Sequence, residues 1–254
     1  MISIAIALIV FGCLFGGVLL GMLLRATLPE HHLSTDSKDV IKLGMGVIGT
    51  LAALVLALLI AAAQGSFREQ RRNIMELSAN IIYLDRVLAR YGPETKEARD
   101  QLRSAVVQTL NQMWPEDSSK PAQLAPTASK AEVLLDKIQA LSPKNDAERS
   151  LQAQALSLAS NLVQMRWLIF VQQVRSVPVI FLIVLAVLVF WFTTIFFSFG
   201  LFAHPNATVI ASLFICALSV TCAIFLMVEL NLPFEGLLRI PSEPLRDALT
   251  YLGQ

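Results

Sequence analysis

The chain has 254 residues, of which 55% are hydrophobic and only 15% are charged, and its formal net charge at pH 7 is +1. Soluble domains average about 25% charged residues. This composition excludes a disordered chain, a strongly basic nucleic-acid-binding protein and a disulfide-rich scaffold. It leaves an integral membrane protein, provided that the apolar residues are clustered along the sequence.

Four uncharged apolar runs occupy residues 2–24, 43–63, 178–200 and 207–228. A helix needs about 20 residues to cross a bilayer core of about 30 Å, and each run is long enough. Barrel strands have about 10 residues of alternating polarity, so they do not use such runs. The first run lacks a basic N-terminal region and a small-residue cleavage site, so we expect a span and not a cleaved signal peptide. The sequence therefore predicts four transmembrane helices.

The first connecting segment, residues 25–42, carries charges of both signs and two adjacent histidines, His31 and His32. Adjacent histidines do not share a helix face, so metal binding here is a weaker interpretation than a solvated loop. We also expect packing, and no metal binding, from the three cysteines within the spans, Cys13, Cys216 and Cys222.

The second connecting segment, residues 64–177, holds most of the charged residues and is expected to be helical. Apolar residues recur in it at coiled-coil spacing in two seams. The seams consist of Ile74, Leu77, Ile81, Leu84, Leu88 and Tyr91, and of Leu151, Ala155, Leu158, Leu162, Met165 and Ile169. Only Gly65 interrupts the pattern between the second span and the first seam, so we expect that span to continue as a stalk. Between the seams we expect helices at residues 96–113 and 130–141, joined by a polar loop.

The chain ends with a short uncharged turn at residues 201–206, the fourth span and an amphipathic tail at residues 229–254. Within the tail, Ser242 is expected to cap a helix over residues 243–251, with Pro244 in its first turn.

The distribution of basic residues near the span ends predicts the orientation in the membrane. On the side of the long segment lie Arg68, Arg71, Arg72, Arg166, Arg175, Arg239 and Arg246, and on the other side Arg25, Lys38 and Lys42. Because the cytoplasmic side carries the excess of Lys and Arg, we expect the long segment, the tail and both termini in the cytoplasm.

Small and hydroxyl side chains form a stripe along the second span, made of Gly46, Thr50, Ala53 and Ala57. Such stripes usually allow close helix packing. The sharper alternative is a pore, in which small side chains leave a lumen. A bulkier and drier pore would instead use the adjacent face of Val47, Leu51, Leu54 and Leu58.

The first and fourth spans carry similar stripes. The first has two G-x-x-x-G pairs, Gly12 with Gly16 and Gly17 with Gly21. The fourth has a weakly polar row of Thr208, Ser212, Cys216 and Ser219. Each of these patterns is first of all a candidate packing face.

Ionisable residues are absent from the four apolar runs, which argues against a proton pump or a proton-driven carrier but not against a passive channel. Arg68, Arg71 and Arg72 follow the second span directly. They interact either with lipid headgroups or, repeated in an oligomer, with anions at a channel mouth. The sequence shows no phosphate-binding loop, zinc signature or nucleophile–His–acid spacing, so we expect neither an enzyme nor a cofactor.

The tail has a recognisable order of residues: Glu229, Pro233, Phe234 and Gly236, followed by Pro244-Leu245. This order resembles the C-terminal signature of the bestrophin-like family of bacterial membrane proteins. Phe67, Arg71, Arg72, Ala79 and Asn80 resemble that family's stalk positions. The resemblance implies a relation to bestrophin chloride channels, which are homo-oligomers whose second span lines a central pore and whose helical insert is cytoplasmic.

The sequence thus predicts an all-α membrane protein with a cytoplasmic helical domain inserted between the second and third of four spans. The expected parts are residues 1–63, 64–177, 178–228 and 229–254. The favoured function is a homo-oligomeric passive ion channel of the bacterial inner membrane that conducts anions, chloride among them. Its partners would be lipid, other copies of itself and inorganic ions, but not nucleic acid. The alternative is a membrane-anchored helical scaffold or signalling module without a pore. We also expect Glu229, at the membrane edge, to pair with an arginine such as Arg68 or Arg72.

Overall fold

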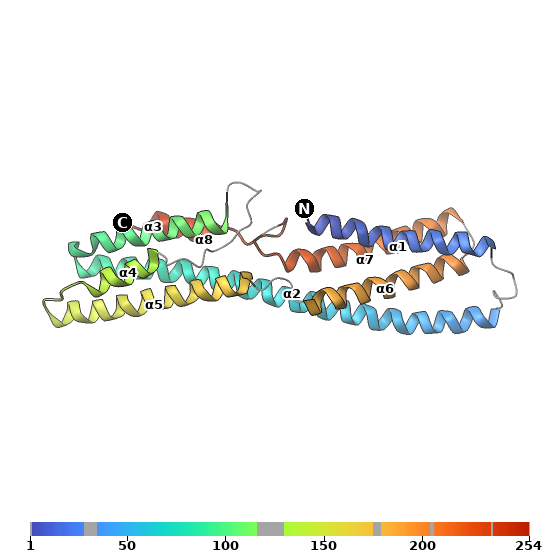
Figure 1. The fold of residues 1–254 in the computed structure, drawn as a ribbon, viewed down its shortest axis with the longest axis horizontal. Coiled ribbons are helices and arrows are strands. Elements are labelled where there is room, and N and C mark those ends of the chain that lie inside the picture. Colours follow the sequence, from blue (N-terminus) through green and yellow to red (C-terminus); the bar gives the residue numbers. More distant parts are fainter. Residues whose placement is uncertain are drawn as a thin grey trace. The chain divides into compact units, whose positions relative to one another are not determined.

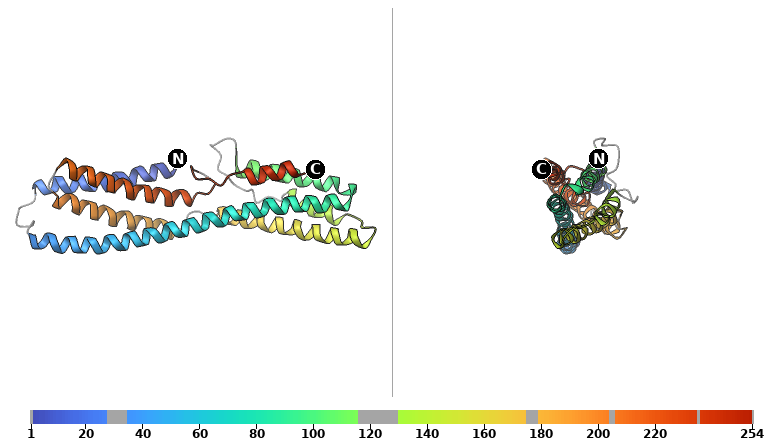
Figure 2. Two further views of the ribbon diagram at one scale, coloured as in Figure 1. Left: turned by 180° about the vertical axis from the view of Figure 1, so that it is seen from behind. Right: turned by 90° about the vertical axis from the view of Figure 1, so that its left-hand side faces the viewer.

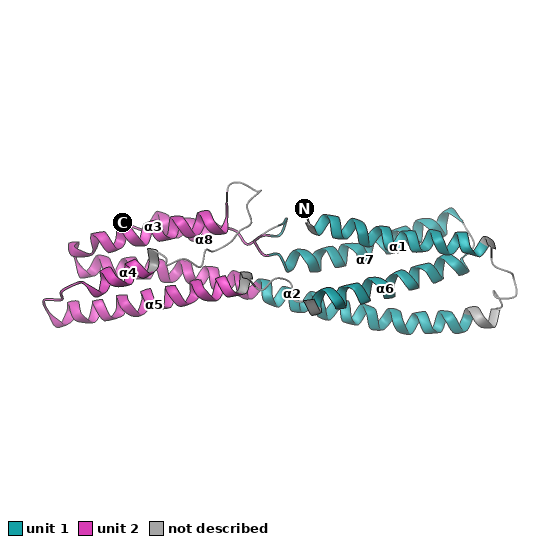
Figure 3. Ribbon diagram, in the orientation of Figure 1, with its two compact units in different colours: residues 1–67, 177–232, 236–238 teal, residues 68–176, 233–235, 239–254 magenta. Residues whose placement is uncertain are grey.

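The computed structural model describes residues 2–27, 35–115, 130–174, 179–203, 206–234 and 236–253. Every element in these ranges is helical. The elements are α1 (Ile2–Thr27), α2 (Thr35–Tyr91), the short 3-10 helix η2 (Pro93–Thr95), α3 (Lys96–Met113), α4 (Lys130–Gln139), α5 (Asp146–Val174), α6 (Val179–Phe202), α7 (Ala207–Leu230) and α8 (Glu243–Tyr251). They form two compact units, coloured separately in Figure 3.

Unit 1 contains α1, the first part of α2, α6 and α7 (Figure 1). Each of these helices is long and apolar enough to span a bilayer, which confirms the prediction of four long apolar helices. Their buried side chains form one hydrophobic core, which includes Val10, Leu14, Val18, Ala52, Leu56, Leu188, Phe192, Ala217, Ile224 and Met227.

Glycines bring the backbones of α1 and α6 into direct contact. A Cβ on Gly21 would lie 2.2 Å from the carbonyl oxygen of Phe197, and one on Gly200 would lie 2.2 Å from that of Val18. Any larger residue at either position would force the helices apart, which is the reason for small residues at membrane helix interfaces. Next to this contact, Arg25 Nη1 donates a 3.0 Å hydrogen bond to the carbonyl oxygen of Phe202 at the end of α6.

Among the described residues, only one of the two G-x-x-x-G pairs in α1 forms a helix contact within the chain. Gly17 and Gly21 face α6, whereas a Cβ on Gly12 or Gly16 would meet nothing within 4 Å. The two pairs look alike in the sequence, so their different environments depend on which side of α1 faces α6.

Unit 2 contains the remainder of α2, η2, α3, α4, α5 and α8. Every residue of the first apolar seam is buried, as are Ala155, Leu162 and Ile169 of the second seam. The helix α2 is continuous over 57 residues and passes through Gly65, so its residues belong to both units (Figures 1 and 2).

The bounds of α3 and α8 are those expected from the sequence, and α4 ends at Gln139, two residues earlier than expected. The expected side-chain cap of α8 is wrong: Ser242 precedes the helix but makes no side-chain capping bond. Its φ of −80° and ψ of −8° are helical, whereas capping side chains require an extended backbone. Pro244 also removes one of the N–H groups that such a cap would bind.

Candidate functional site: the outward face of α2 and the tail motif

The four small residues of the second span all lie on the surface of the chain. Gly46, Thr50, Ala53 and Ala57 are exposed, and so are the bulkier residues of the adjacent face, Val47, Leu51, Leu54 and Leu58. We call these two adjacent faces together the outward face of α2. The opposite side of the helix packs on the core of unit 1 through Met45, Ile48, Ala52, Val55, Leu56 and Leu59.

The apolar stretch of α2 is the least covered of the four candidate spans. Only 11% of its most apolar window is buried, compared with 28% in α1 and 33% in α6. An apolar surface of this kind requires lipid or another protein surface to cover it. The outward face of α2 is therefore an apolar surface that something outside the described chain must cover.

The single hydroxyl group on this face, that of Thr50, is already hydrogen-bonded to the backbone of its own helix. Thr50 Oγ1 donates a 2.8 Å hydrogen bond to the carbonyl oxygen of Val47. In α6 and α7, Thr194 and Ser212 likewise donate to carbonyl oxygens four residues earlier. Hydroxyls bonded in this way can accept a hydrogen bond from outside the helix but have no proton to donate.

The three arginines after the span, Arg68, Arg71 and Arg72, are exposed on α2. Positions 68, 71 and 72 share one side of a helix because they are three and four residues apart. Glu69 is exposed on the same turn and partly offsets their charge. The arginines belong to unit 2, whereas the outward face of α2 belongs to unit 1.

The tail motif places a buried carboxylate in unit 1. Glu229 is fully buried at the end of α7 and accepts hydrogen bonds from Ser3 Oγ at 2.5 Å and from the backbone N–H groups of Leu237 at 3.0 Å and Leu238 at 3.4 Å. Its partners within unit 1 are thus a hydroxyl and two amides. Arg68 and Arg72 belong to unit 2, so the expected pairing with one of them stays a prediction. The carboxylate holds the tail against the start of α1.

Gly236 is needed for this arrangement on two grounds. Its φ of +90° is a conformation that residues with a side chain rarely adopt. A Cβ at this position would also lie 2.3 Å from Oε2 of Glu229. The spacing between Glu229 and Gly236 in the motif therefore reflects a turn that closes on the carboxylate.

The other half of the motif lies in unit 2 and contacts Trp114. The rings of Trp114 and Phe234 meet edge to face, with centroids 6.0 Å apart. Trp114 Nε1 donates a 2.9 Å hydrogen bond to the carbonyl oxygen of Ile240, whose own N–H donates to the carbonyl oxygen of Pro233 at 2.7 Å. One side chain at the end of α3 thus fixes both ends of the Pro233–Ile240 turn.

A family model for the bestrophin-like domain matches residues 12–245, which is nearly the whole chain. The chain belongs to the bestrophin-like family. No curated protein and no solved structure matches it. Family membership and four apolar helices together make this bestrophin-like protein a multi-pass membrane protein in contact with lipid.

Sequence reasoning missed one residue on each side of the tail motif of this bestrophin-like protein, Ser3 in unit 1 and Trp114 in unit 2. Ser3 lies more than 200 positions from Glu229 in the sequence, and a single serine at the start of an apolar run gives no signal. Trp114 gave a weak one, because an indole N–H near the end of an amphipathic helix usually needs an acceptor. The weak metal site suggested by His31 and His32 lies outside the described residues.

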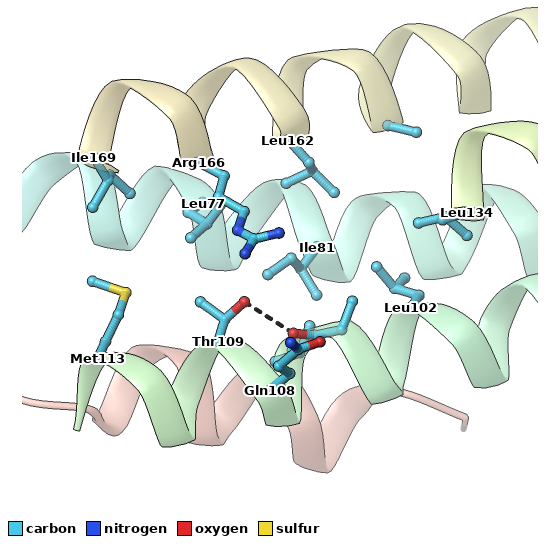
Figure 4. Close-up of a pocket in the computed structure, with 13 residues that line it drawn as sticks. Leu77, Ile81, Leu102, Gln108, Thr109, Met113, Leu134, Leu162, Arg166 and Ile169 are labelled. Carbon is cyan, nitrogen blue, oxygen red and sulfur yellow. Dashed lines mark hydrogen bonds between the residues drawn. The ribbon is translucent and has the colours of Figure 1, made fainter. Parts of the chain in front are cut away.

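Unit 2 of the bestrophin-like protein also contains a small, partly open cavity of about 50 Å³ between α2, α3, α4 and α5 (Figure 4). The side chain of Arg166 points into it among apolar residues such as Leu77, Ile81 and Leu162. Burial lowers the pKa of the Arg166 guanidinium from its usual value, and Glu132 partly opposes this effect. The volume suits a few water molecules but no organic ligand.

Proposed function

We propose that this bestrophin-like protein is a homo-oligomeric passive ion channel that conducts anions, with α2 arranged around the central axis. The observation that carries the proposal is the outward face of α2, which is apolar, lacks ionisable groups between Leu43 and Ala63 and is exposed in the part of the chain that the structure describes. Neighbouring copies could cover one part of this face while another part surrounds an ion path.

Small residues supply the physical reason for association between copies. Lipid covers an apolar helix as well as protein does, so helices associate in a bilayer through close packing and not through hydrophobicity. Gly46, Ala53 and Ala57 on α2, and Gly12 and Gly16 on α1, offer surfaces on which another backbone can approach closely.

The proposed ion path is passive and lined by uncharged side chains. The Thr50 hydroxyl is bonded to its own helix, so it does not provide a donor for an anion in this rotamer. An uncharged constriction can still conduct when it stays hydrated, and it gates when it loses its water. Selectivity for anions would come from the field of Arg68, Arg71 and Arg72, repeated in every copy.

The proposed orientation places unit 2, the tail and both chain termini in the cytoplasm of the cell that carries this protein in its inner membrane. The excess of arginine on that side of the spans supports it. The proposal includes no enzymatic step and no cofactor.

Recording from the purified protein in planar bilayers tests this function. A threefold gradient of potassium chloride should give a current whose reversal potential lies toward that of chloride. A reversal potential toward that of potassium would contradict the proposed anion selectivity. The absence of any conductance would contradict the proposed channel.

A membrane-anchored scaffold without a pore is the second candidate. The observation that favours it is the packed interior of unit 2, where the apolar seam of α2 is buried from Ile74 to Tyr91. This candidate predicts no current in the same recordings and a defined protein partner for unit 2.

A further inference from the structure

A second cavity in unit 2, of about 360 Å³, lies beside the start of α3. Four of the residues that line it are Lys96, Arg99, Asp100 and Arg103. They are spaced by three and four positions, so they occupy one face of α3. The other walls are formed by Asp85 and Pro93 on one side and by Leu252 and Gly253 on the other. We call this the α3 cavity.

The buried acid of the α3 cavity is already neutralised. Asp85, whose side chain is 2% exposed, accepts Arg99 Nε at 2.7 Å and Arg99 Nη2 at 2.8 Å in a two-pronged ion pair. The N–H of Gly253 also donates to Asp85 Oδ2 at 3.3 Å. The hydrogen bonds to Asp85 raise the pKa of the Arg99 guanidinium, so the group stays charged and fixed in the cavity wall.

The acids at the start of α3 are also engaged with cations outside the cavity. Glu94 accepts a 2.8 Å hydrogen bond from Lys144, and Glu97 forms an ion pair with Lys137. Neither carboxylate is therefore available to balance the basic face of α3.

Two cations that line the α3 cavity form no ion pair among the described residues, and with Arg99, Asp85 and Asp100 they give the lining a formal net charge of +1. Within the part of the chain that the structure describes, Lys96 and Arg103 take part in none of the ion pairs, and Arg103 only donates a long bond of 3.4 Å to the carbonyl oxygen of Leu252. Asp100 is the single acid of the lining that has no ion pair among these described residues.

We propose that the α3 cavity binds a small phosphorylated anion, which Lys96 and Arg103 contact directly while Arg99 is held in the wall by Asp85. Arginine and lysine are the side chains that recognise phosphate oxygens, through charge-assisted hydrogen bonds. The volume lies at the lower end of the range for ligand pockets, about 300–1,000 Å³, so the ligand is compact. This site is independent of the proposed channel.

Titration calorimetry on the full chain in uncharged detergent tests the site, with inorganic phosphate and pyrophosphate as probes and sodium chloride at equal ionic strength as the blank. We expect saturable binding of both probes, with pyrophosphate the tighter. Lys96→Gln and Arg103→Gln should each weaken binding about tenfold, because each removes a charge-assisted contact. Asp100→Asn should tighten it about threefold.

Arg90→Gln is the matched control, since Arg90 is an exposed cation of α2 that does not line the cavity. It should leave the affinity unchanged. The absence of saturable binding to the wild-type chain would overturn the proposal. An equal loss in Arg90→Gln and Lys96→Gln would also overturn it, because binding would then follow net charge alone. Asp100→Asn keeps the test valid if a cation variant fails to fold.

Discussion

Two surfaces of unit 1 are built from small residues, but one is packed against another helix and the other is exposed. Where α1 meets α6, Gly17, Gly21 and Gly200 allow the two backbones to touch. On the outward face of α2, a Cβ on Gly46 would meet no described residue within 4 Å, and Thr50, Ala53 and Ala57 are exposed. A row of small residues therefore indicates close packing of another helix. Only the fold tells whether that helix belongs to the same chain or to another molecule.

The largest expected effect tests the contact between α1 and α6. Gly21→Val places a side chain where the Phe197 carbonyl oxygen already lies, and no flexible group can move aside. We expect the free energy of unfolding to fall by about 3 kcal/mol or more, the upper end for overpacking. Thermal unfolding of the detergent-solubilised chain measures it. Gly12→Val is the matched control on the same helix, and a comparable loss there in the dissociated chain would contradict the contrast between the two glycine pairs.

The next effect concerns the buried carboxylate that holds the tail to α1. Glu229→Ala leaves the Ser3 hydroxyl and the N–H groups of Leu237 and Leu238 without their acceptor, which should cost about 2 kcal/mol of local stability. The released tail should be cut faster by trypsin at the exposed Arg239. Glu243→Ala removes an exposed acid from the same tail and should leave the cleavage rate unchanged; equal rates for both variants would show that Glu229 does not hold the tail.

A smaller effect is expected in unit 2, where Trp114 fixes the other half of the tail motif. Trp114→Phe keeps the aromatic contact with Phe234 but leaves the Ile240 carbonyl oxygen without its donor. We expect a loss of about 1 kcal/mol in thermal unfolding of the full chain. Trp167→Phe, at an exposed position of α5, should not change the free energy of unfolding measurably. A larger loss in Trp167→Phe than in Trp114→Phe would show that Trp114 does not fix the tail.

The smallest expected effect distinguishes the role of the outward face of α2 from that of the three arginines that follow it. Replacement of Arg68, Arg71 and Arg72 by glutamine should lower chloride conductance about threefold at 0.01 M salt and hardly at all at 1 M. The Debye length falls from about 30 Å to about 3 Å over that range, so the field of exposed arginines is screened. A loss of equal size at both salt concentrations would mean that these arginines shape the path itself.

Local patterns in the sequence predicted the helices well and the contacts poorly. The bounds of α3 and α8 follow from apolar periodicity and turn residues within each segment. The tail motif was recognised as a series of residues, but its geometry requires Ser3 from the start of the chain and the positive φ of Gly236. The two glycine pairs of α1 were indistinguishable because their difference depends on the position of α6. The sequence likewise offered two candidate faces of α2, and both lie on the surface of the single chain.

The most direct test of the central proposal is cysteine accessibility along α2 during channel recording. Single cysteines are placed at Gly46, Thr50, Ala53 and Ala57, and in a second set at Val47, Leu51, Leu54 and Leu58, after Cys13, Cys216 and Cys222 are replaced by serine. A charged thiol reagent in the aqueous phase should block the current at positions of one set, which then identifies the face that lines the path. If the current persists at every position of both sets, or if none of the proteins conducts, α2 does not surround an ion path and the account is wrong.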